Sequence, residues 1–240
     1  MIREALLHLK KNCDRKKRLK KYRGYRIAST GDDMYKYIDW TKAYTNAVIK
    51  NVFEIGANYA QDAEVLAEGF DVAPENVYVF EAHPQICDAI RKIHPKYNCF
   101  NKAVFNENKQ MTFNLCDIDS VNSGVSSLYA SKKFQYEKEY PIEAIRMDTF
   151  LNNHNIDNIG FCKIDVEGCD YEVLEGFGTL LKNVVVVQVE GEHVECWEGE
   201  HLYFDIESIL KKNGFELLLF ERHLDQSDSL WVNKKYVRTK

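Results

Sequence analysis

The run Lys163-Ile164-Asp165-Val166-Glu167-Gly168 decides how the fold of this chain is interpreted. It ends an apolar stretch that begins at Ile159, so it predicts a buried strand whose end carries two carboxylates, Asp165 and Glu167. Open sheets of parallel strands bind their ligands at the carboxyl ends of the strands. The run therefore predicts a site at that edge of a sheet, and an enzyme rather than a scaffold.

Two earlier strand ends carry the parts of a nucleoside site. A strand stops on Gly56, where the missing side chain lets the backbone approach a ligand closely. The next strand stops on Glu81, 25 residues later, where a carboxylate can accept both hydroxyls of a ribose. Taken alone, Glu81 would be a surface acid or a helix cap, but its pairing with Gly56 favours a nucleoside site.

The glycine pattern also separates two cofactors. A dinucleotide site has three glycines, because the pyrophosphate sits on the helix N-terminus, whereas here only Gly56 stands at the turn. Glu54 suits a cationic ligand, and S-adenosylmethionine carries a sulfonium and an amino group without a phosphate. Glu54, Gly56 and Asn58 together favour this cofactor over NAD, although Glu54 could equally be a hydrogen-bonded acid at a strand end.

Apolar runs of strand length alternate with helical stretches, which predicts an α/β fold with βαβ units and a mostly parallel sheet. Helices are expected over residues 59–69, 84–94, 149–154, 171–181 and 204–213. Strands are expected over residues 52–55, 76–81, 97–100, 142–147, 159–165 and 184–190, with an extended segment at 111–115 and a closing hairpin formed by 215–220 and 229–232.

Composition limits the class of protein. The 240 residues are 45% hydrophobic and 29% charged, which suits one globular domain, and no apolar run approaches the roughly 20 residues of a membrane span. Seven cysteines without a CxxC pair indicate reduced thiols rather than disulfides or zinc ligands. These features predict a cytoplasmic protein.

Charge divides the chain unevenly. Residues 1–26 contain eleven Lys and Arg against Glu4 and Asp14, although the total charge is −5. We expect a basic, helical N-terminal extension over residues 1–50 and a catalytic domain over 51–240. The extension could lie on an anionic membrane or a polyanion, making the protein peripheral to the membrane, or it could be a solvated helix packed across the domain. The acidic remainder argues against nucleic acid as a partner.

With these residues in place, the chain resembles the FkbM family of S-adenosylmethionine-dependent methyltransferases. The resemblance is carried by Val52–Asn58, Val79–Pro84, Asn101–Val104, Ser123–Leu128, Arg146–Leu151, Phe161–Gly168 and Leu174–Gly176. It implies a class I methyltransferase (Rossmann-like) fold, with a mostly parallel seven-stranded sheet, helices on both faces and an antiparallel last strand. It also implies methyl transfer to oxygen, usually a hydroxyl of a sugar or of a secondary metabolite.

The resemblance marks a set of cofactor-binding residues, which comprises Glu54, Gly56, Asn58, Glu81, Ala82, Ser126 and Asp165. Ser126 lies in a loop that the resemblance places over the cofactor, while ordinary turn chemistry is the alternative. There are two departures. The family usually has Gly where Ala60 stands and commonly Asp where Glu54 stands. We expect the extra methyl of Ala60 to tighten the turn around the methionine part of the cofactor.

The predicted chemistry is a displacement in which a hydroxyl loses its proton. Asp165 or Glu167 could take that proton, or Asp165 could hold Mg or Mn together with Glu190 and His193. Lys163 could orient Asp165 or Glu190 through a salt bridge, or extend outward into solvent. The acids around His193 could also be an exposed loop.

The expected acceptor is a small molecule or glycan with a sugar hydroxyl. Two other classes stay open, a nucleic-acid methyltransferase and a non-catalytic nucleoside-binding module. The first lacks its usual Asn-Pro-Pro-Tyr-like or Pro-Cys motif, and the second would not need Asp165 and Glu167.

Overall fold

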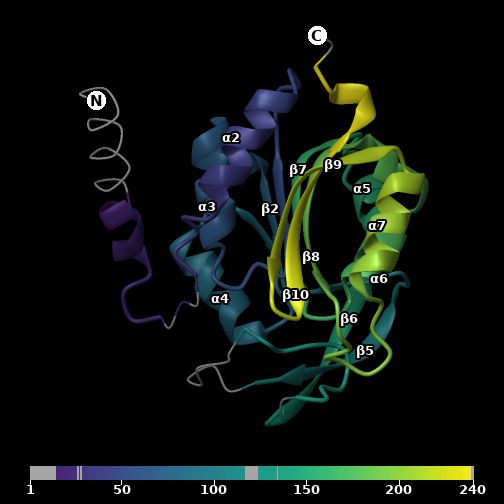
Figure 1. Cartoon of the computed structure of the whole chain (residues 1–240). Coiled ribbons are helices and arrows are strands. Elements are labelled where there is room, and N and C mark those ends of the chain that lie inside the picture. The colour runs from purple at the N-terminus through teal and green to yellow at the C-terminus, as the bar shows by residue number, and fades with distance from the viewer. Residues whose placement is uncertain (1–14, 26, 28, 117–123, 134, 239–240) are drawn as a thin grey trace.

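A seven-stranded sheet forms the centre of the computed structural model, which describes residues 15–25, 27, 29–116, 124–133 and 135–238 (Figure 1). The strand order is β3-β2-β1-β7-β8-β10-β9. The strands are β1 (Val52–Ile55), β2 (Val77–Phe80), β3 (Asn98–Phe100), β7 (Ile159–Ile164), β8 (Val184–Glu192), β9 (Phe215–His223) and β10 (Gln226–Asn233).

Strand direction in this sheet agrees with the expectation from the family resemblance. The pairs β3-β2, β2-β1, β1-β7 and β7-β8 are parallel. The last strand, β10, is antiparallel to both of its neighbours, β8 and β9, because it returns from β9 through a tight hairpin. The predicted mostly parallel, seven-stranded sheet with an antiparallel last strand is confirmed.

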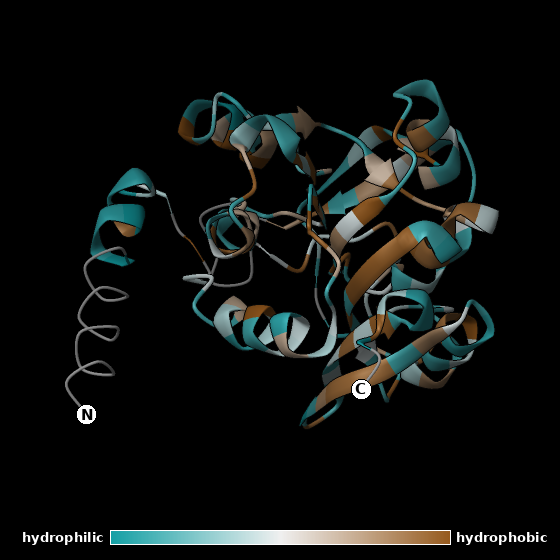
Figure 2. Ribbon diagram, turned by 90° about the horizontal axis from the view of Figure 1, so that it is seen from above, coloured by the Kyte–Doolittle hydropathy of each residue, from teal (hydrophilic) through white to brown (hydrophobic). Residues whose placement is uncertain are grey.

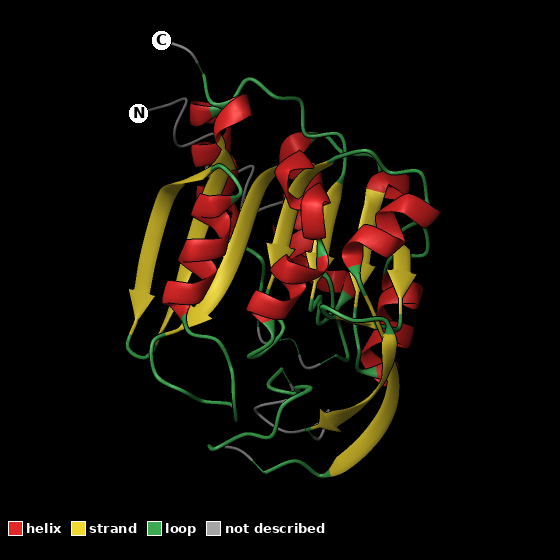
Figure 3. Ribbon diagram, turned by 90° about the vertical axis from the view of Figure 1, so that its right-hand side faces the viewer, coloured by secondary structure: helices red, strands yellow, loops and turns green. Residues whose placement is uncertain are grey.

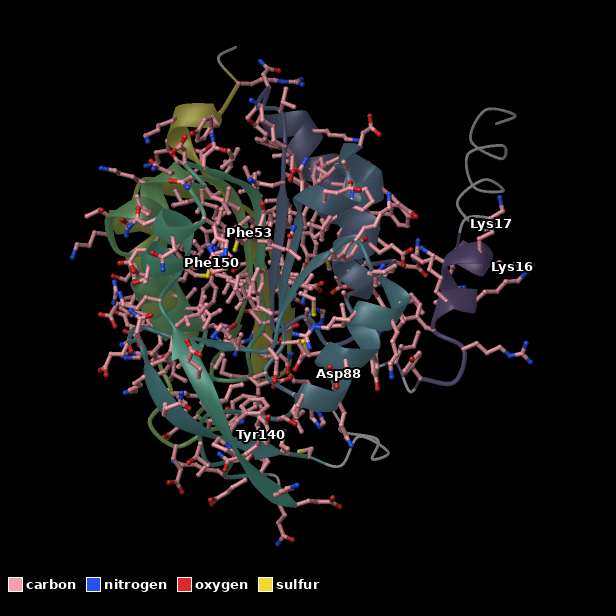
Figure 4. All side chains as sticks on the ribbon, turned by 180° about the vertical axis from the view of Figure 1, so that it is seen from behind. Lys16, Lys17, Phe53, Asp88, Tyr140 and Phe150 are labelled. Atoms are coloured by element: carbon pink, nitrogen blue, oxygen red, sulfur yellow. The ribbon has the colours of Figure 1, made fainter. Side chains whose placement is uncertain are left out.

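Helices cover both faces of the sheet. One face packs against α2 (Met34–Tyr44), α3 (Gln61–Phe70) and α4 (Pro84–Ile93), and the other against α5 (Met147–Asn153), α6 (Asp170–Gly176) and α7 (Tyr203–Lys212). Apolar residues concentrate on the strands between these layers, while the outer helix surfaces are hydrophilic (Figure 2). Phe53 and Phe150 meet edge to face in the second layer, with ring centroids 6.5 Å apart (Figure 4).

The expected helix over residues 171–181 is shorter than predicted. It ends at Gly176, and a 3-10 turn over Gly178–Asn183 follows. A Cβ at Gly176 would lie 2.3 Å from the carbonyl oxygen of Phe105, and Gly178 has a φ of +52°, so the chain changes direction where only glycine fits.

A second sheet, which the sequence did not reveal, has the order β4-β6-β5. It contains β4 (Ala103–Val104), β5 (Lys109–Leu115) and β6 (Lys138–Ile145), so the strand expected at 142–147 and the extended segment at 111–115 lie here rather than in the main sheet. Its apolar side packs against Ala82 and Val166, which follow β2 and β7. The small sheet therefore lies at the carboxyl edge of the main sheet (Figure 3).

The residues before β1 pack against the rest of the chain. Residues 15–21 are helical, and Tyr22 is buried in the same apolar layer as Met34 and Tyr37 of α2. Thr45 forms an isolated bridge with Val237 near the other end of the chain. Residues 1–14, with half of the basic segment, lie outside the described residues. In the part that the structure describes, no helix combines the length and the apolar character needed to cross a membrane.

Candidate active site

The turn after β1 touches the end of β7. Gly56 has a φ of +81°, and a Cβ there would lie 1.8 Å from the carbonyl oxygen of Asp165. No side chain fits that gap, so the packing of the turn against the end of β7 requires a glycine here even without a ligand. This contact joins the first predicted strand end to the one that carries Asp165 and Glu167.

A cavity of about 200 Å³ opens at this edge of the sheet. All the predicted cofactor-binding residues line it, namely Glu54, Gly56, Asn58, Glu81, Ala82, Ser126 and Asp165, and so do Lys163 and Glu167. One part of the wall is apolar and comprises Phe80, Ile86, Val104, Phe113 and Leu128. Val104 and Phe113 come from the small sheet, which therefore completes the cavity.

Glu81 is fixed by two backbone groups. Its Oε2 accepts a hydrogen bond of 2.8 Å from the N–H of Asn58, and its Oε1 accepts one of 2.7 Å from the N–H of His83. The side chain is buried, and burial raises its pKa to about 7. The carboxylate thus braces the turns after β1 and β2, and each oxygen keeps a second lone pair for a ligand.

Glu54 also makes a hydrogen bond within the fold. Its carboxylate accepts a hydrogen bond of 3.1 Å from the N–H of Ala63, in the first turn of α3. Burial, and then Asp62, raise the pKa of Glu54 well above its usual range. Glu54 lines the cavity, but its geometry is that of the hydrogen-bonded strand-end acid that we gave as the alternative.

Lys163 points into the site rather than into solvent. Its Nζ lies 2.8 Å from Asp165 and 3.4 Å from Asp62, and the side chain is buried. Burial by itself would lower the pKa of Lys163, but the attraction of Asp165, Asp62 and Glu54 raises it well above its usual value. The ammonium therefore keeps its proton and orients Asp165, and among the described residues it forms its ion pairs with Asp165 and Asp62 rather than with Glu190.

Asp165 also belongs to a group of three neighbouring carboxylates. Asp165, Glu167 and Glu190 each offer an oxygen within 4.8 Å of the others. Glu167 is held by an unusual backbone φ of +58°, and its carbonyl accepts a hydrogen bond of 2.6 Å from Ser127 Oγ. Burial, and then the charge of Asp165, raise the pKa of both Glu167 and Glu190 well above their usual range.

His193 does not join this group among the described residues. Its backbone N–H donates to Asp225 over 2.6 Å, which turns the chain away from the end of β8 toward the β9–β10 hairpin. Its ring lies 5.2 Å from that of Tyr203 and 6.0 Å from that of Phe220. The structure thus brings Asp165 and Glu190 together with Glu167, and it leaves His193 in an aromatic cluster.

Ala60 is not part of the cavity wall. It lies in the left-handed region with a φ of +61°, just before α3, and its side chain is fully buried. Glycine is favoured at such a position by its backbone freedom, so the departure from the family pattern concerns the conformation of the turn rather than contact with the ligand.

Five polar residues of the cavity were not predicted as site residues, namely Ser29, Gln61, Asp62, His83 and Lys102. Gln61 and Asp62 begin α3 directly after the Gly56 turn, a position that could have marked them. Gln61 Nε2, His83 Nδ1 and Asn58 Oδ1 are buried atoms without a hydrogen-bond partner. Such atoms need a partner, so the cavity suits a polar ligand.

The comparisons with known proteins agree with this geometry. A family model described as the methyltransferase FkbM domain matches residues 54–217. The crystal structure of methyltransferase FkbM from Methylobacillus flagellatus KT is similar to 76% of this chain, with a TM-score of 0.50 and 12% identity. The match covers only 43% of that protein, so this chain corresponds to less than half of its length.

A second solved structure, magnesium protoporphyrin IX methyltransferase from Synechocystis PCC 6803 with bound SAM, is similar over 93% of this chain and 91% of its own, with a TM-score of 0.45 and 12% identity. No curated protein matches the chain. At 12% identity the structure from Methylobacillus flagellatus KT supports the fold alone, and the family rests on the matched domain model.

Proposed function

The chain belongs to the methyltransferase FkbM domain family, and we propose that it transfers a methyl group from S-adenosylmethionine to a sugar hydroxyl of a glycan or glycoconjugate. The observation that carries the proposal is the single cavity wall shared by Glu81, which suits a ribose, and Asp165, which suits an acceptor hydroxyl. The sulfonium of the bound cofactor supplies the electrophilic methyl carbon.

The cavity residues fit this cofactor. Glu81 can accept ribose hydroxyls with its remaining lone pairs, and the apolar wall suits the adenine ring. The unpartnered atoms of Asn58, Gln61 and His83 supply an acceptor and further polar contacts in the same cavity. A nucleoside that carries hydroxyls, ring nitrogens and an amino acid tail can satisfy all three.

For the acceptor we propose Asp165 as the group that takes the hydroxyl proton. It is the carboxylate of the acidic group that an ammonium, Lys163, contacts directly. The raised pKa of Glu167 favours its protonated form, which makes Glu167 the weaker candidate for that step. Lys163 is then a positioning residue that holds Asp165 toward the cavity, and orientation of this kind contributes much of the rate of a displacement.

A divalent cation is a second version of the same chemistry. The oxygens of Asp165, Glu167 and Glu190 are close enough to share one ion, and an all-oxygen set suits Mg or Mn better than Zn. His193 is not needed for such a site. EDTA should abolish turnover, and Mg or Mn should restore it, if an ion lowers the pKa of the acceptor hydroxyl, whereas a carboxylate base acting alone should be indifferent to EDTA.

We also propose that the basic segment contacts an anionic membrane or a polyanion. Lys16, Lys17 and Lys20 are exposed, and Lys16 and Lys17 point away from the body of the protein (Figure 4). Arg18 is instead buried and bound to Asp32 at 2.7 Å, so it fastens the segment to the domain. Binding to vesicles with and without phosphatidylserine checks this, and the triple change of the three lysines to Gln should reduce binding to the anionic vesicles.

The cofactor assignment is tested by calorimetry with S-adenosylmethionine, its demethylated product and NAD. The first two should bind and NAD should not. Glu81→Ala should weaken binding about tenfold or more, since a hydrogen bond to a charged group contributes about 1.5–3 kcal/mol, whereas the exposed Glu139→Ala should not. Tight binding of NAD without any response to the sulfonium cofactor would contradict the proposal.

A further inference from the structure

Two carboxylate–amide pairs cross between β8 and β10. Gln188 Nε2 on β8 donates to Asp228 Oδ1 on β10 over 2.9 Å, and Gln226 on β10 donates to Glu190 on β8. Asp228 and Glu190 stand directly opposite each other in the antiparallel ladder. Like charges in that position destabilise a sheet, so these pairs are not explained by sheet stability.

The crossed pairs lie beside the active-site cavity and do not form part of its wall. Glu190 belongs to the close group with Asp165 and Glu167, and the last two line the cavity. In the sheet order β2-β1-β7-β8-β10, Glu81 follows β2 while Asp228 lies on β10. A molecule that reaches from Asp165 away from the ribose side therefore meets Glu190 and then Asp228.

An independent observation points to a ligand there. Gln188 is 1% exposed, and its Oε1 has no hydrogen-bond partner although its Nε2 is bound to Asp228. A buried amide oxygen of this kind needs a donor. In the neighbouring strand pair Gln188 stands opposite Lys163, so the side chain lies between the ion pair of the site and Asp228.

The side chains of Gln188, Glu190, Gln226 and Asp228 form a surface whose chemistry indicates the kind of ligand that it binds. Each amide orients its carboxylate through one oxygen, which leaves the other oxygen able to accept a hydrogen bond. Two nearby cations are bound to other acids, because Lys163 is bound to Asp165 and Lys36 to Glu221. His223 Nε2 lies 3.6 Å from Asp228 Oδ2 and forms an ion pair with it when the imidazole is protonated. The surface offers carboxyl oxygens that accept hydrogen bonds, and it suits a ligand with several donors.

We propose that Glu190 and Asp228, oriented by Gln226 and Gln188, form the acceptor subsite, which binds an uncharged sugar through neighbouring hydroxyls and rejects sugars that carry a carboxylate or phosphate. The inference rests on the proposed function and names its substrate class. Vicinal hydroxyls match the spacing of paired carboxylate oxygens, whereas an anionic group would meet two acids that face each other at the end of the site.

The first test measures transfer and binding with a panel of methyl glycosides, comprising neutral hexosides, the matching uronic acids and hexose 6-phosphates, in the presence of cofactor or its demethylated product. Neutral members should bind and be methylated, and anionic members should not. Asp228→Asn should raise the KM for the best neutral member about tenfold, with cofactor affinity unchanged, while Glu216→Gln on the neighbouring β9 should leave it unchanged. Equal use of anionic members, or binding of none at high millimolar concentration, overturns the subsite.

The second test does not depend on the acceptor. Asp228→Asn and Glu190→Gln keep the shape and the amide contact but remove a facing charge, so each should raise the Tm by about 2–4 °C in EDTA at pH 8. A lower Tm in both variants would show that the pairs are structural and would overturn the inference. Failure of the proposed function is separate, because it would appear as loss of cofactor binding by the unaltered protein.

Discussion

The two sides of the active site use the same residue type in opposite ways. On the side of β1 and β2, the carboxylates of Glu54 and Glu81 each accept backbone N–H groups. On the side of β7, β8 and β10, Glu190 lies close to Asp165 and stands opposite Asp228. A carboxylate that is bonded to the backbone stabilises a turn, whereas facing carboxylates cost stability.

This difference shows where the protein tolerates a loss of stability caused by neighbouring carboxylates. In the proposed function the first side holds one geometry for one cofactor, and the hydrogen bonds that Glu54 and Glu81 accept from the backbone provide that rigidity. In the proposed function the second side handles a proton and an acceptor. Carboxyls with a raised pKa lie on both sides, Glu54 and Glu81 on the first, and Glu167, Glu190 and Asp170, at about 8, on the second. Perturbed groups of this kind gather at functional sites.

Replacing Asp165 by Asn should have the largest effect on the second side. Turnover should fall about 10²–10⁴-fold, as for loss of a general base, while calorimetry should show cofactor affinity nearly unchanged. Lys163 keeps Asp62 as a partner at 3.4 Å, so the fold should persist. Glu167→Gln serves as the matched control and should cost less. Near-normal turnover of Asp165→Asn would move the base to Glu167 or Glu190.

Replacing Gly56 by Ala tests the contact that joins the two sides. The added Cβ would meet the Asp165 carbonyl oxygen at 1.8 Å, so strain and overpacking together should lower the free energy of unfolding by about 2–5 kcal/mol. Gly214→Ala is the control, because Gly214 has a φ of +87° and open space around its Cβ direction, which leaves only the backbone cost of about 1–2 kcal/mol. Urea unfolding measures both variants. Equal decreases in the free energy of unfolding of Gly56→Ala and Gly214→Ala would show that the protein relieves the contact with Asp165 at no cost.

Glu81, on the first side, should make the stability of the protein depend on pH. Burial, with a contribution from Asp165, raises its pKa from 4.5 to about 7, so the protonated form is favoured in the folded state. The stability from this shift is fully present below pH 4.5 and is lost as the pH rises to 7, a change of up to about 3 kcal/mol. Urea unfolding at pH 5 and pH 8 should show a steeper loss in the unaltered protein than in Glu81→Gln. Identical slopes would contradict the shift.

The smallest effect is expected from Tyr22→Phe, which tests whether the N-terminal residues support the first side. Tyr22 Oη donates to Glu64 over 2.7 Å and lies 2.8 Å from His94 Nε2. Glu64 belongs to α3, whose first turn lines the cavity, so loss of this donor should destabilise the protein by about 1–3 kcal/mol. Tyr44→Phe, at a 41% exposed position on α2, should change stability by less than about 0.5 kcal/mol. Cofactor affinity should change in Tyr22→Phe and stay the same in Tyr44→Phe.

Much of the architecture follows from the sequence alone. The strand ends at Gly56, Glu81 and Asp165, and the closing hairpin, could be predicted because apolar periodicity and motif spacing are local properties of the chain. The predicted cofactor residues line one cavity because the carboxyl ends of parallel strands meet at one edge of the sheet.

Only the tertiary structure decided how those residues work. Gly56 is required by a carbonyl more than a hundred residues away, and Asp228 faces Glu190 through a ladder formed late in the chain. The small sheet, and the separation of His193 from Asp165, likewise depend on pairing between distant segments. Sequence patterns report the period of each element, whereas contacts between elements depend on the packing of the whole chain, so the partner of each carboxylate could not be predicted.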